Sequence, residues 1–485
     1  MKQGVTEKKE EIDTRNQTIT QDYSIGRLCC SSIGPSYGEP IGLALDAIVV
    51  SPCCESSETD GNESGIVASS DFQLQFPPQF STNGKINYRI LLQINGNLLQ
   101  ETFLCMKLPT QGKGTMCVFE EGMSTKPSSD KLQQLVQQRI LSPGRNLIRY
   151  ILVKDNLSAK NPNSDDSCIN QNSQYTTIGQ TEAYVYLWSV HDTIIISDID
   201  GTVTKSDVRG VIDSIFTEKY GHVHEGVCSF FSEIVKYQEE HESDMASKKN
   251  GKVRVLYLSS RPMRLIHSTR KFLSLLHQTS QHETVPQKNI MSSCMGRGSV
   301  DIDAELPDDI EKGKKALIGL PPGPIFLHTG TLSTVLVTEL VRKSTHEFKA
   351  DLLARQVVLP FVVAGKEKSG SRLFLAGFGN KKTDSLAYEM VGMKSHDIYI
   401  INASSVLVST SASLEFEDEA EESDNEVVGC FAWEQMVRTE DLSFEMISVS
   451  NPSKATKITS QNKRHFKGYN DPKLKKELLR RISSY

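Results

Sequence analysis

Residues 193–207 read "TIIISDIDGTVTKSD", and this stretch decides the fold. An unbroken apolar run leads directly into Asp198 and Asp200, two acids that a folded chain does not bury without partners. Short continuous apolar runs are typical of strands in a parallel sheet that is covered on both faces. Ligands of such sheets bind beyond the carboxyl ends of the strands, so we expect both carboxylates at that edge. Neighbouring carboxylates repel each other and need a cation, and a site made only of oxygen ligands favours Mg²⁺.

Apolar runs alternate with helical stretches throughout the region after residue 190, which is typical of an α/β domain with a parallel sheet. The stretch at 264–276 has the apolar spacing of an amphipathic helix. The runs that predict strands are 193–197, 253–259, 323–327, 372–378 and 397–401.

The region before residue 190 has a different pattern, in which apolar and polar residues alternate as in half-buried strands. The clearest case is "INYRILLQI" at 86–94, followed by Asn95–Gly96, a strong signal for a hairpin turn. Such signals occur over 41–108 and again over 146–188, which predicts a β-sandwich. A polar stretch at 154–175 interrupts the second group and predicts a mobile loop.

Composition and length narrow the class of protein. A chain of 485 residues, 38% of them hydrophobic, can form two or three domains with real cores. The formal net charge of -6 argues against a nucleic-acid-binding protein, which is usually basic. No apolar run reaches about 18 residues and the amino terminus is polar, so neither a membrane span nor a secretory signal is expected. Ten scattered cysteines without a C-x-x-C motif are typical of reduced thiols in a soluble cytoplasmic protein.

Several polar or charged segments lie outside these patterns. Residues 1–21 predict disorder, and residues 22–33 predict either a core-packed segment or a short helix that touches a membrane. The acidic run from Glu415 to Glu426 predicts a solvated loop. Residues 451–485 hold ten Lys and Arg against two acids, which predicts a solvated tail or a contact with an anionic surface.

Three further motifs follow the D-x-D-G-T stretch in order. The stretch "VLYLSSRP" places Ser259 at a strand end, "HEFKADLL" places Lys349 on a helix, and "AGFGNKKTDSLAY" places Asn380 and Asp384 after a strand. In this order the motifs resemble those of the haloacid dehalogenase superfamily. Several longer stretches of the sequence resemble the lipins, the magnesium-dependent phosphatidate phosphatases. They are "YLWSVHDTIIISDIDGTVTKSD", "PPGPIFLHTGTL", "LDAIVV" and "DFQLQF". The likeness covers residues 22–110 and 131–410.

The resemblance implies a fold of two parts. One is a Rossmann-like haloacid dehalogenase catalytic domain, and the other is an immunoglobulin-like β-sandwich assembled from the N-terminal and C-terminal lipin regions. The long regulatory middle of animal lipins is missing, so their nuclear import and phosphorylation control are not implied. The implied boundaries are a disordered 1–21, an N-terminal lipin region at 22–110, a linker at 111–130, further sandwich strands at 131–190, a catalytic domain at 191–450 and a basic tail at 451–485.

The resemblance also implies catalytic roles for residues of the motifs. Asp198 would be the nucleophile that takes the phosphoryl group, and Asp200 would act first as a general acid and then as a general base. Thr202 and Ser259 would hold phosphoryl oxygens. Lys349 would neutralise negative charge on the phosphoryl group and on the nucleophile.

The implied cofactor is Mg²⁺. It would be held by Asp198, by the backbone carbonyl of Asp200 and by Asn380, with Asp384 orienting these ligands. The implied reaction is hydrolysis of phosphatidate to diacylglycerol and phosphate. The implied partner is a phosphatidate-containing membrane surface, which the protein would bind peripherally from the cytoplasm, at the endoplasmic reticulum.

Two other functions remain open at the level of sequence. One is a soluble phosphomonoesterase of the same superfamily. The other is a phosphatidate-binding module without catalysis, as in lipin-like domains that have lost the second acid of the motif. Because Asp200 is intact here, the sequence favours an enzyme. No nucleic-acid partner is expected, and no oligomeric state is predicted.

Overall fold

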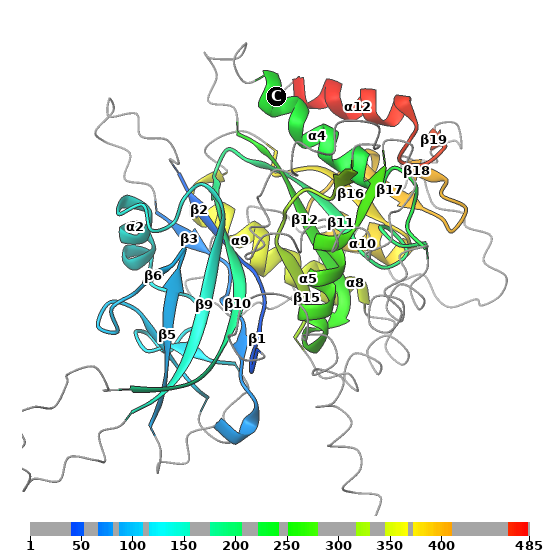
Figure 1. Ribbon diagram of the computed structural model, residues 1–485. Coiled ribbons are helices and arrows are strands. Elements are labelled where there is room, and N and C mark those ends of the chain that lie inside the picture. Colours follow the sequence, from blue (N-terminus) through cyan, green and yellow to red (C-terminus); the bar gives the residue numbers. More distant parts are fainter. Residues whose placement is uncertain are drawn as a thin grey trace, which may run out of the picture.

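The computed structural model describes residues 40–52, 66–80, 87–109, 116–155, 175–205, 222–241, 251–279, 317–329, 345–366, 372–409 and 464–483. They form a β-rich part and an α/β part that lie side by side and share a buried core (Figure 1). The expectations for residues 1–21 and 22–33, for most of the loop at 154–175 and for the run Glu415–Glu426 lie outside the described residues.

The β-rich part is built on one eight-stranded sheet. Its strands are β2 (Ala47–Ser51), β3 (Ala68–Ser69), β5 (Tyr88–Ile94), β6 (Asn97–Leu98), β7 (Cys105–Lys107), β8 (Val118–Phe119), β9 (Gly144–Asp155) and β10 (Tyr175–Ser189). Their order in space is β3-β2-β10-β9-β5-β7-β8, with β6 paired to β5. Strands from both groups that the sequence predicts therefore belong to the same sheet, since β10 pairs with β2 and β9 pairs with β5.

Alternating apolar residues bury one face of this sheet. In β5 the side chains of Ile90, Leu92 and Ile94 are buried, while the residues between them are half-buried. Asn95 and Gly96 have positive φ angles of 49° and 83°, as a type I′ turn requires, and β6 returns antiparallel to β5. The structure thus confirms both the strand and the hairpin turn that the sequence predicts.

A small second layer covers the buried face. It consists of the ribbon of β1 (Leu43–Ala44) and β4 (Leu74–Gln75), joined by helix α2 (Ser129–Gln137) in the same core. The described residues therefore form one large sheet with a small cover, and they do not confirm an immunoglobulin-like sandwich.

The prediction of a linker at 111–130 is wrong for the residues of this range that the structure describes. Cys117 and Phe119 are fully buried, and the Phe119 ring packs edge-on against Phe72 with a centroid distance of 5.5 Å. Because these side chains fill the core beneath the ribbon, the chain here is part of the fold.

The α/β part is built on a seven-stranded sheet. Its strands are β11 (Thr193–Asp198), β12 (Val253–Pro262), β15 (Ile325–His328), β16 (Phe374–Gly379), β17 (Ile398–Ile401), β18 (Leu407–Ser409) and β19 (Arg464–Phe466). Their order is β15-β12-β11-β16-β17-β18-β19, and the first five are parallel. All five strands that the sequence predicts after residue 190 are confirmed.

Helices cover both faces of this sheet, which explains the unbroken apolar run of β11. Ile195 belongs to the core under one face, and Ile194 and Ile196 belong to the core under the other. The first face carries α4 (Val227–His241), α5 (Ile266–Leu275) and α12 (Pro472–Ser483), and the second carries α8 (Thr345–Leu353), the π-helical turn η7 (Ala354–Val358), α9 (Leu359–Val363) and α10 (Lys382–Met390).

Short elements complete the described chain. They are the 3-10 turns η1 (Pro78–Phe80), η5 (Met263–Leu265) and η9 (Ser395–Asp397) and the hairpin of β13 (His277–Thr279) and β14 (Leu317–Gly319). None of the described helices combines the length and the apolar character needed to cross a bilayer.

The C-terminal segment differs from the expected solvated tail. Its described residues, 464–483, add the edge strand β19 and the helix α12 to the α/β part, so this part extends beyond residue 450 (Figure 1). Leu474, Leu478 and Ile482 recur every fourth residue and are buried in the core. A count of basic residues does not reveal this stripe, because Lys and Arg occupy five of the other positions of the helix.

Buried contacts fix the β-rich part against the α/β part. Trp188 at the end of β10 packs against Phe361 of α9, with ring centroids 6.3 Å apart. The buried carboxylate of Asp46 accepts a hydrogen bond from Arg270 Nη2 at 2.8 Å and one from the backbone N–H of Ile325 at 3.0 Å. The β-rich part is therefore held against α5, β15 and α9 of the α/β part.

Candidate active site

The residues expected to act together meet at the carboxyl edge of the parallel sheet. Asp198 is the last residue of β11, Ser259 lies near the end of β12, and Asn380 directly follows β16. Because β12, β11 and β16 are neighbours in the sheet, their carboxyl ends lie side by side. Lys349 reaches this edge from α8.

Lys349 joins two acids from different motifs. Its Nζ donates to Asp198 Oδ1 and to Asp384 Oδ1, each at 2.6 Å, and all three side chains are buried. The other oxygen of Asp384 accepts hydrogen bonds from the backbone N–H groups of Asn380 at 2.9 Å and Lys381 at 3.0 Å. Asp384 thus fixes the turn between β16 and α10, and three of its four lone pairs accept these hydrogen bonds.

The buried position of Asp198 determines its electrostatics. Burial raises the pKa of the Asp198 carboxyl to about 8, and the Lys349 ammonium opposes this rise only in part. Burial also disfavours charge on Lys349, but the two carboxylates outweigh it and raise the pKa of the lysine. One ammonium facing two carboxylates leaves negative charge uncompensated when all three ionise.

This donor set fits a small divalent cation. Within the residues that the structure describes, Asp198 Oδ2 receives a long contact, at 3.4 Å, from Thr202 Oγ1, and each carboxylate oxygen has two lone pairs. The described residues contain no group of three or more His, Cys, Asp or Glu placed to hold a metal. A cation would therefore depend on Asp198 together with backbone and amide oxygens, and the carbonyl of Asp200 and the amide of Asn380 lie at the same edge.

Asp200 is bound by a different cationic residue from the one that binds Asp198. Its carboxylate accepts two hydrogen bonds from the guanidinium of Arg261, Nη2 to Oδ1 at 2.6 Å and Nε to Oδ2 at 2.9 Å. Ser259 Oγ also donates to Asp200 Oδ2 at 2.9 Å. The structure therefore joins Asp200 directly to Ser259 and adds Arg261, a residue that sequence reasoning missed.

Arg261 is as deeply buried as Asp198 and Lys349, with 4% of its surface exposed. Its Nη1 donates to Thr269 Oγ1 at 3.2 Å, and its guanidinium lies 5.9 Å from the centre of the Phe272 ring. The signal that could have found it is its place two residues after Ser259, on the same side of an extended strand. The strand that the sequence predicts here ends at residue 259, two residues before Arg261.

Residues far apart in the chain brace the turn after β11. Gly201 has a positive φ of 81°, and the next residue, Thr202, is buried. The hydroxyl of Tyr469 donates to the carbonyl of Thr202 at 3.1 Å. The ring of His224 lies between the carbonyl of Gly201, at 3.3 Å, and Ser405 Oγ, at 2.8 Å. Burial lowers the pKa of His224 to about 4, so the ring is neutral at pH 7.

The fold and the site together define the class of this protein. A carboxylate at the end of a central parallel strand, a second acid two residues later and a lysine that joins two motifs are features of haloacid dehalogenase-like α/β proteins. A family model described as LNS2 (Lipin/Ned1/Smp2) matches residues 124–296 and 302–428, more than half of the chain. The chain therefore belongs to the Lipin/Ned1/Smp2 family.

Three curated relatives are similar to this chain over short stretches. It is 34% identical over 84 residues to phosphatidate phosphatase PAH1 of Arabidopsis thaliana, which covers 17% of this chain and 8% of the relative. It is 33% identical over 92 residues to phosphatidate phosphatase LPIN3 of Mus musculus, with coverages of 19% and 10%. It is 36% identical over 86 residues to phosphatidic acid phosphohydrolase 1 of Saccharomyces cerevisiae, with coverages of 17% and 10%. The matched stretches thus span a tenth or less of the length of each relative.

Proposed function

We propose that this protein is a phosphatidate phosphatase, which hydrolyses phosphatidate to diacylglycerol and phosphate. The observation that carries the proposal is the buried Asp198 carboxylate, bound by Lys349 at 2.6 Å, with a second acid two residues later. The names of all three relatives describe hydrolysis of phosphatidate or phosphatidic acid.

In the first step, Asp198 Oδ2 attacks the phosphorus, since Lys349 holds the other oxygen. The bond from phosphorus to the glycerol oxygen breaks, and its electron pair goes to that oxygen. Asp200, in its protonated form, gives the oxygen a proton, and diacylglycerol leaves. Thr202 and Ser259 hold the phosphoryl oxygens in this arrangement, and Lys349 offsets their charge.

In the second step, the Asp200 carboxylate takes a proton from water, and the water oxygen attacks the phosphorus of the aspartyl-phosphate. The bond from phosphorus to Asp198 breaks, phosphate leaves, and the Asp198 carboxylate is restored. Mg²⁺, held by Asp198, the carbonyl of Asp200 and Asn380, would supply additional stabilisation of negative charge on the phosphoryl oxygens.

Arg261 and Ser259 would control where Asp200 points. Their hydrogen bonds hold the Asp200 carboxylate beside the site, at 2.6 to 2.9 Å. A phosphoryl oxygen that accepts the Ser259 hydroxyl removes one of these bonds and so lets Asp200 turn toward the substrate. Arg261 is thus a positioning residue, because it acts through Asp200.

The remaining parts of the proposal concern the setting of the reaction. Phosphatidate is a membrane lipid, so the protein would act while peripherally bound to a phosphatidate-containing membrane, on the cytoplasmic face of the endoplasmic reticulum. The eight-stranded sheet with its β1–β4 cover would be the immunoglobulin-like domain of the lipins. Its strands from two separate chain regions support this assignment.

The test is phosphate release from phosphatidate in mixed micelles and from a soluble monoester, glycerol 3-phosphate, with Mg²⁺ or with excess chelator. We expect release from phosphatidate alone, and only with the metal. Release from both substrates at equal rates would favour a soluble phosphomonoesterase. Binding of phosphatidate without release would instead identify a lipid-binding module.

A further inference from the structure

The turn after β11 is held by Thr204, a residue that has no role in the reaction proposed above. Thr204 is buried, with 2% of its surface exposed, and its Oγ1 accepts a hydrogen bond from the backbone N–H of Gly201 at 3.1 Å. The same hydroxyl donates to the carbonyl of Ile199 at 3.4 Å, and the backbone N–H of Thr204 donates to that carbonyl at 3.1 Å. Thr204 also pairs with Val223 in an antiparallel bridge. These contacts fix the position of the hydroxyl that binds Gly201.

The N–H of Gly201 sets the direction of the Asp200 carbonyl, because both groups belong to one planar peptide unit. None of the peptide bonds in the described residues is cis. In a trans peptide unit the C=O and the N–H point in opposite directions. Since this N–H points to the buried Thr204 hydroxyl, the Asp200 carbonyl points away from it. A rotation of the carbonyl would therefore break the hydrogen bond to Thr204.

The next two carbonyls of the turn are bound by residues from other parts of the chain. The Nε2 atom of His224 lies 3.3 Å from the carbonyl oxygen of Gly201. The hydroxyl of Tyr469 donates to the carbonyl of Thr202 at 3.1 Å. Each of these contacts fixes the peptide plane to which the carbonyl belongs. The plane that carries the Asp200 carbonyl is therefore followed by two more planes with a fixed orientation.

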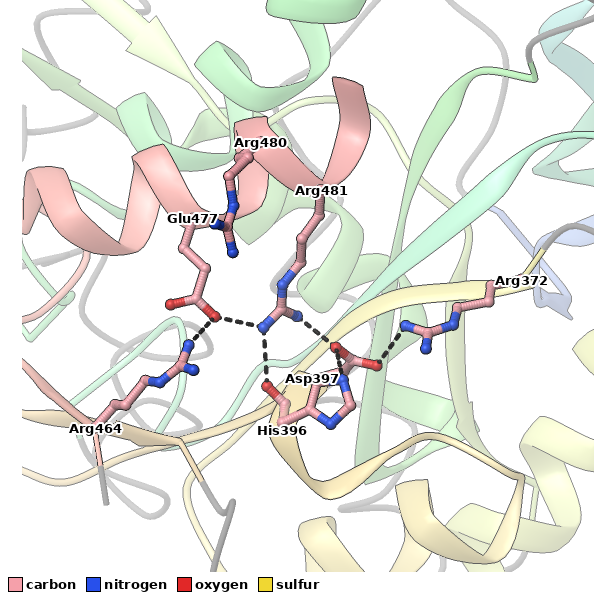
Figure 2. Close-up of a pocket in the computed structure, with 7 residues that line it drawn as sticks. All are labelled: Arg372, His396, Asp397, Arg464, Glu477, Arg480 and Arg481. Atoms are coloured by element: carbon pink, nitrogen blue, oxygen red, sulfur yellow. Dashed lines mark hydrogen bonds and ion pairs between the residues drawn. The ribbon is translucent and has the colours of Figure 1, made fainter. Parts of the chain in front are cut away.

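The segment that supplies Tyr469 is itself well anchored. The Tyr469 ring packs against Phe230 and Phe378, with centroid distances of 5.3 and 5.9 Å. Farther along the chain, Arg481 in the last turn of α12 donates to the buried Asp397, as Figure 2 shows. The turn after β11 therefore rests against a packed part of the fold.

We propose that Thr204 is a positioning residue, whose hydroxyl holds the Gly201 N–H and so directs the Asp200 carbonyl toward the Mg²⁺ site. This inference rests on the proposed function, in which that carbonyl is a ligand together with Asp198 and Asn380. Hydrogen bonds behind a metal ligand fix its orientation, and their loss typically weakens metal binding by about 10- to 100-fold. Thr204 would act in this way on a backbone ligand.

A purely structural role for Thr204 leads to a different expectation. If the hydroxyl only stabilised the turn, its removal would lower the free energy of unfolding and leave the affinity for a divalent cation unchanged. If the hydroxyl directs a ligand, its removal weakens cation binding even in a folded protein. Metal affinity measured without substrate therefore separates the two roles.

Titration of the full chain with Mn²⁺, in the absence of phosphatidate, tests the proposal. Mn²⁺ takes the same oxygen ligands as Mg²⁺, its free concentration is measured by electron paramagnetic resonance, and competition by Mg²⁺ shows that both bind one site. Thr204→Val removes the hydroxyl and keeps the branched shape, whereas Thr204→Ser keeps the hydroxyl. We expect the Kd for Mn²⁺ to rise by about 10- to 100-fold in Thr204→Val and to stay at the wild-type value in Thr204→Ser.

Thr181→Val is the matched control, because it also removes a buried threonine hydroxyl. The hydroxyl of Thr181 donates to the carbonyl of Gly42 at 2.8 Å in the β-rich part, so its loss should leave Mn²⁺ binding unchanged. Wild-type affinity in folded Thr204→Val, or an equal loss of affinity in Thr204→Ser or Thr181→Val, would overturn the proposal. If Thr204→Val does not fold, Thr204→Ala removes the same hydroxyl and carries the same expectation.

This test gives a result that does not depend on the proposed reaction, because no lipid is present. Phosphate release from phosphatidate by the wild type is measured separately. Weaker Mn²⁺ binding in Thr204→Val, with no phosphate release by the wild type, would support the role of Thr204 and refute the proposed function. Phosphate release by the wild type, with normal Mn²⁺ binding in Thr204→Val, would refute the role of Thr204 and keep the proposed function.

Discussion

At the scale of single residues, Arg261 sets the position of the Asp200 carboxylate. The two form a bidentate pair in which both side chains are largely shielded, with 16% of the Asp200 side chain and 2% of the Arg261 side chain exposed. A lysine in place of Arg261 would keep the charge but lose the two-pronged geometry that orients the acid. The position of the acid, rather than the charge of the site, then limits the rate.

We therefore expect Arg261→Lys to lower kcat by about 10- to 100-fold with little change in KM, because a small misplacement of a catalytic group slows chemistry more than binding. The measurement is phosphate release from phosphatidate micelles over a range of substrate. Arg264→Lys, on the exposed turn that follows, is the matched control and should keep the full rate. A wild-type kcat for Arg261→Lys would show that Asp200 needs no such support.

His224 braces the turn after β11 in its neutral form, which makes stability depend on pH. Burial lowers its pKa to about 4 in the folded protein, against about 6.5 for an unfolded histidine. The contribution is therefore complete above about pH 6.5 and declines as the pH falls toward 4. Between about pH 7 and pH 5 we expect the free energy of unfolding to fall by about 2 kcal/mol through this residue.

Urea unfolding of the wild type, of His224→Gln and of the exposed His222→Gln at both pH values tests this expectation. The His224→Gln protein should lose less stability on acidification than the wild type, and the His222→Gln protein should lose as much. An equal loss in all three proteins would assign the effect to other groups.

At the scale of elements, the strands of the parallel sheet could be predicted, and the last helix could not. Continuous apolar runs such as Ile194–Ile196 arise because both faces of β11 are covered, and this pattern is local in sequence. In α12 the stripe of Leu474, Leu478 and Ile482 is also local, but the excess of basic residues favoured a solvated tail. Net charge describes a surface and does not exclude a buried face.

The residues of the candidate site also fall into two groups, those that the sequence could predict and those that it could not. Asp198 could be named because it ends a recognisable apolar strand, and Ser259 and Lys349 could be named because they follow it in the order of the haloacid dehalogenase motifs. Arg261 and Tyr469 were not named from the sequence. Arg261 binds Asp200 and Tyr469 binds Thr202, and in each pair the partners lie far apart in the chain and meet only in the fold.

The packing of α12 leads to a stability prediction. Leu478 is fully buried in the core beside α4, so Leu478→Ala should lower the free energy of unfolding by about 2–5 kcal/mol. The exposed Lys476→Ala on the same helix should change it by less than about 0.5 kcal/mol. Denaturant unfolding measures both, and equal effects would mean that α12 does not pack as described.

At the scale of the whole molecule, Asp46 links the β-rich part to the α/β part. Its carboxylate accepts hydrogen bonds from the backbone N–H of Tyr184 at 2.9 Å, from Ile325 at 3.0 Å and from Arg270 at 2.8 Å. Removing the carboxylate leaves the Arg270 charge and two backbone donors without this partner.

Asp46→Ala should therefore destabilise the protein by about 3–5 kcal/mol, as breaking a buried ion pair does. Asp351→Asn, at an exposed ion pair of α8, is the matched control and should cost less than about 1 kcal/mol. The melting temperatures of both variants, measured by thermal unfolding, test this expectation. A melting temperature for Asp46→Ala equal to that of the wild type would show that the two parts are stable without this link.

In the proposed reaction, the Asp198 carboxylate is the nucleophile that attacks phosphatidate. The most direct measurement is the initial rate of phosphate release from phosphatidate micelles by the wild type, Asp198→Asn and Asp351→Asn, with the fold of each checked by thermal unfolding. We expect a rate at least about 10³-fold lower for folded Asp198→Asn and an unchanged rate for Asp351→Asn. A folded Asp198→Asn protein that releases phosphate at the wild-type rate would contradict it.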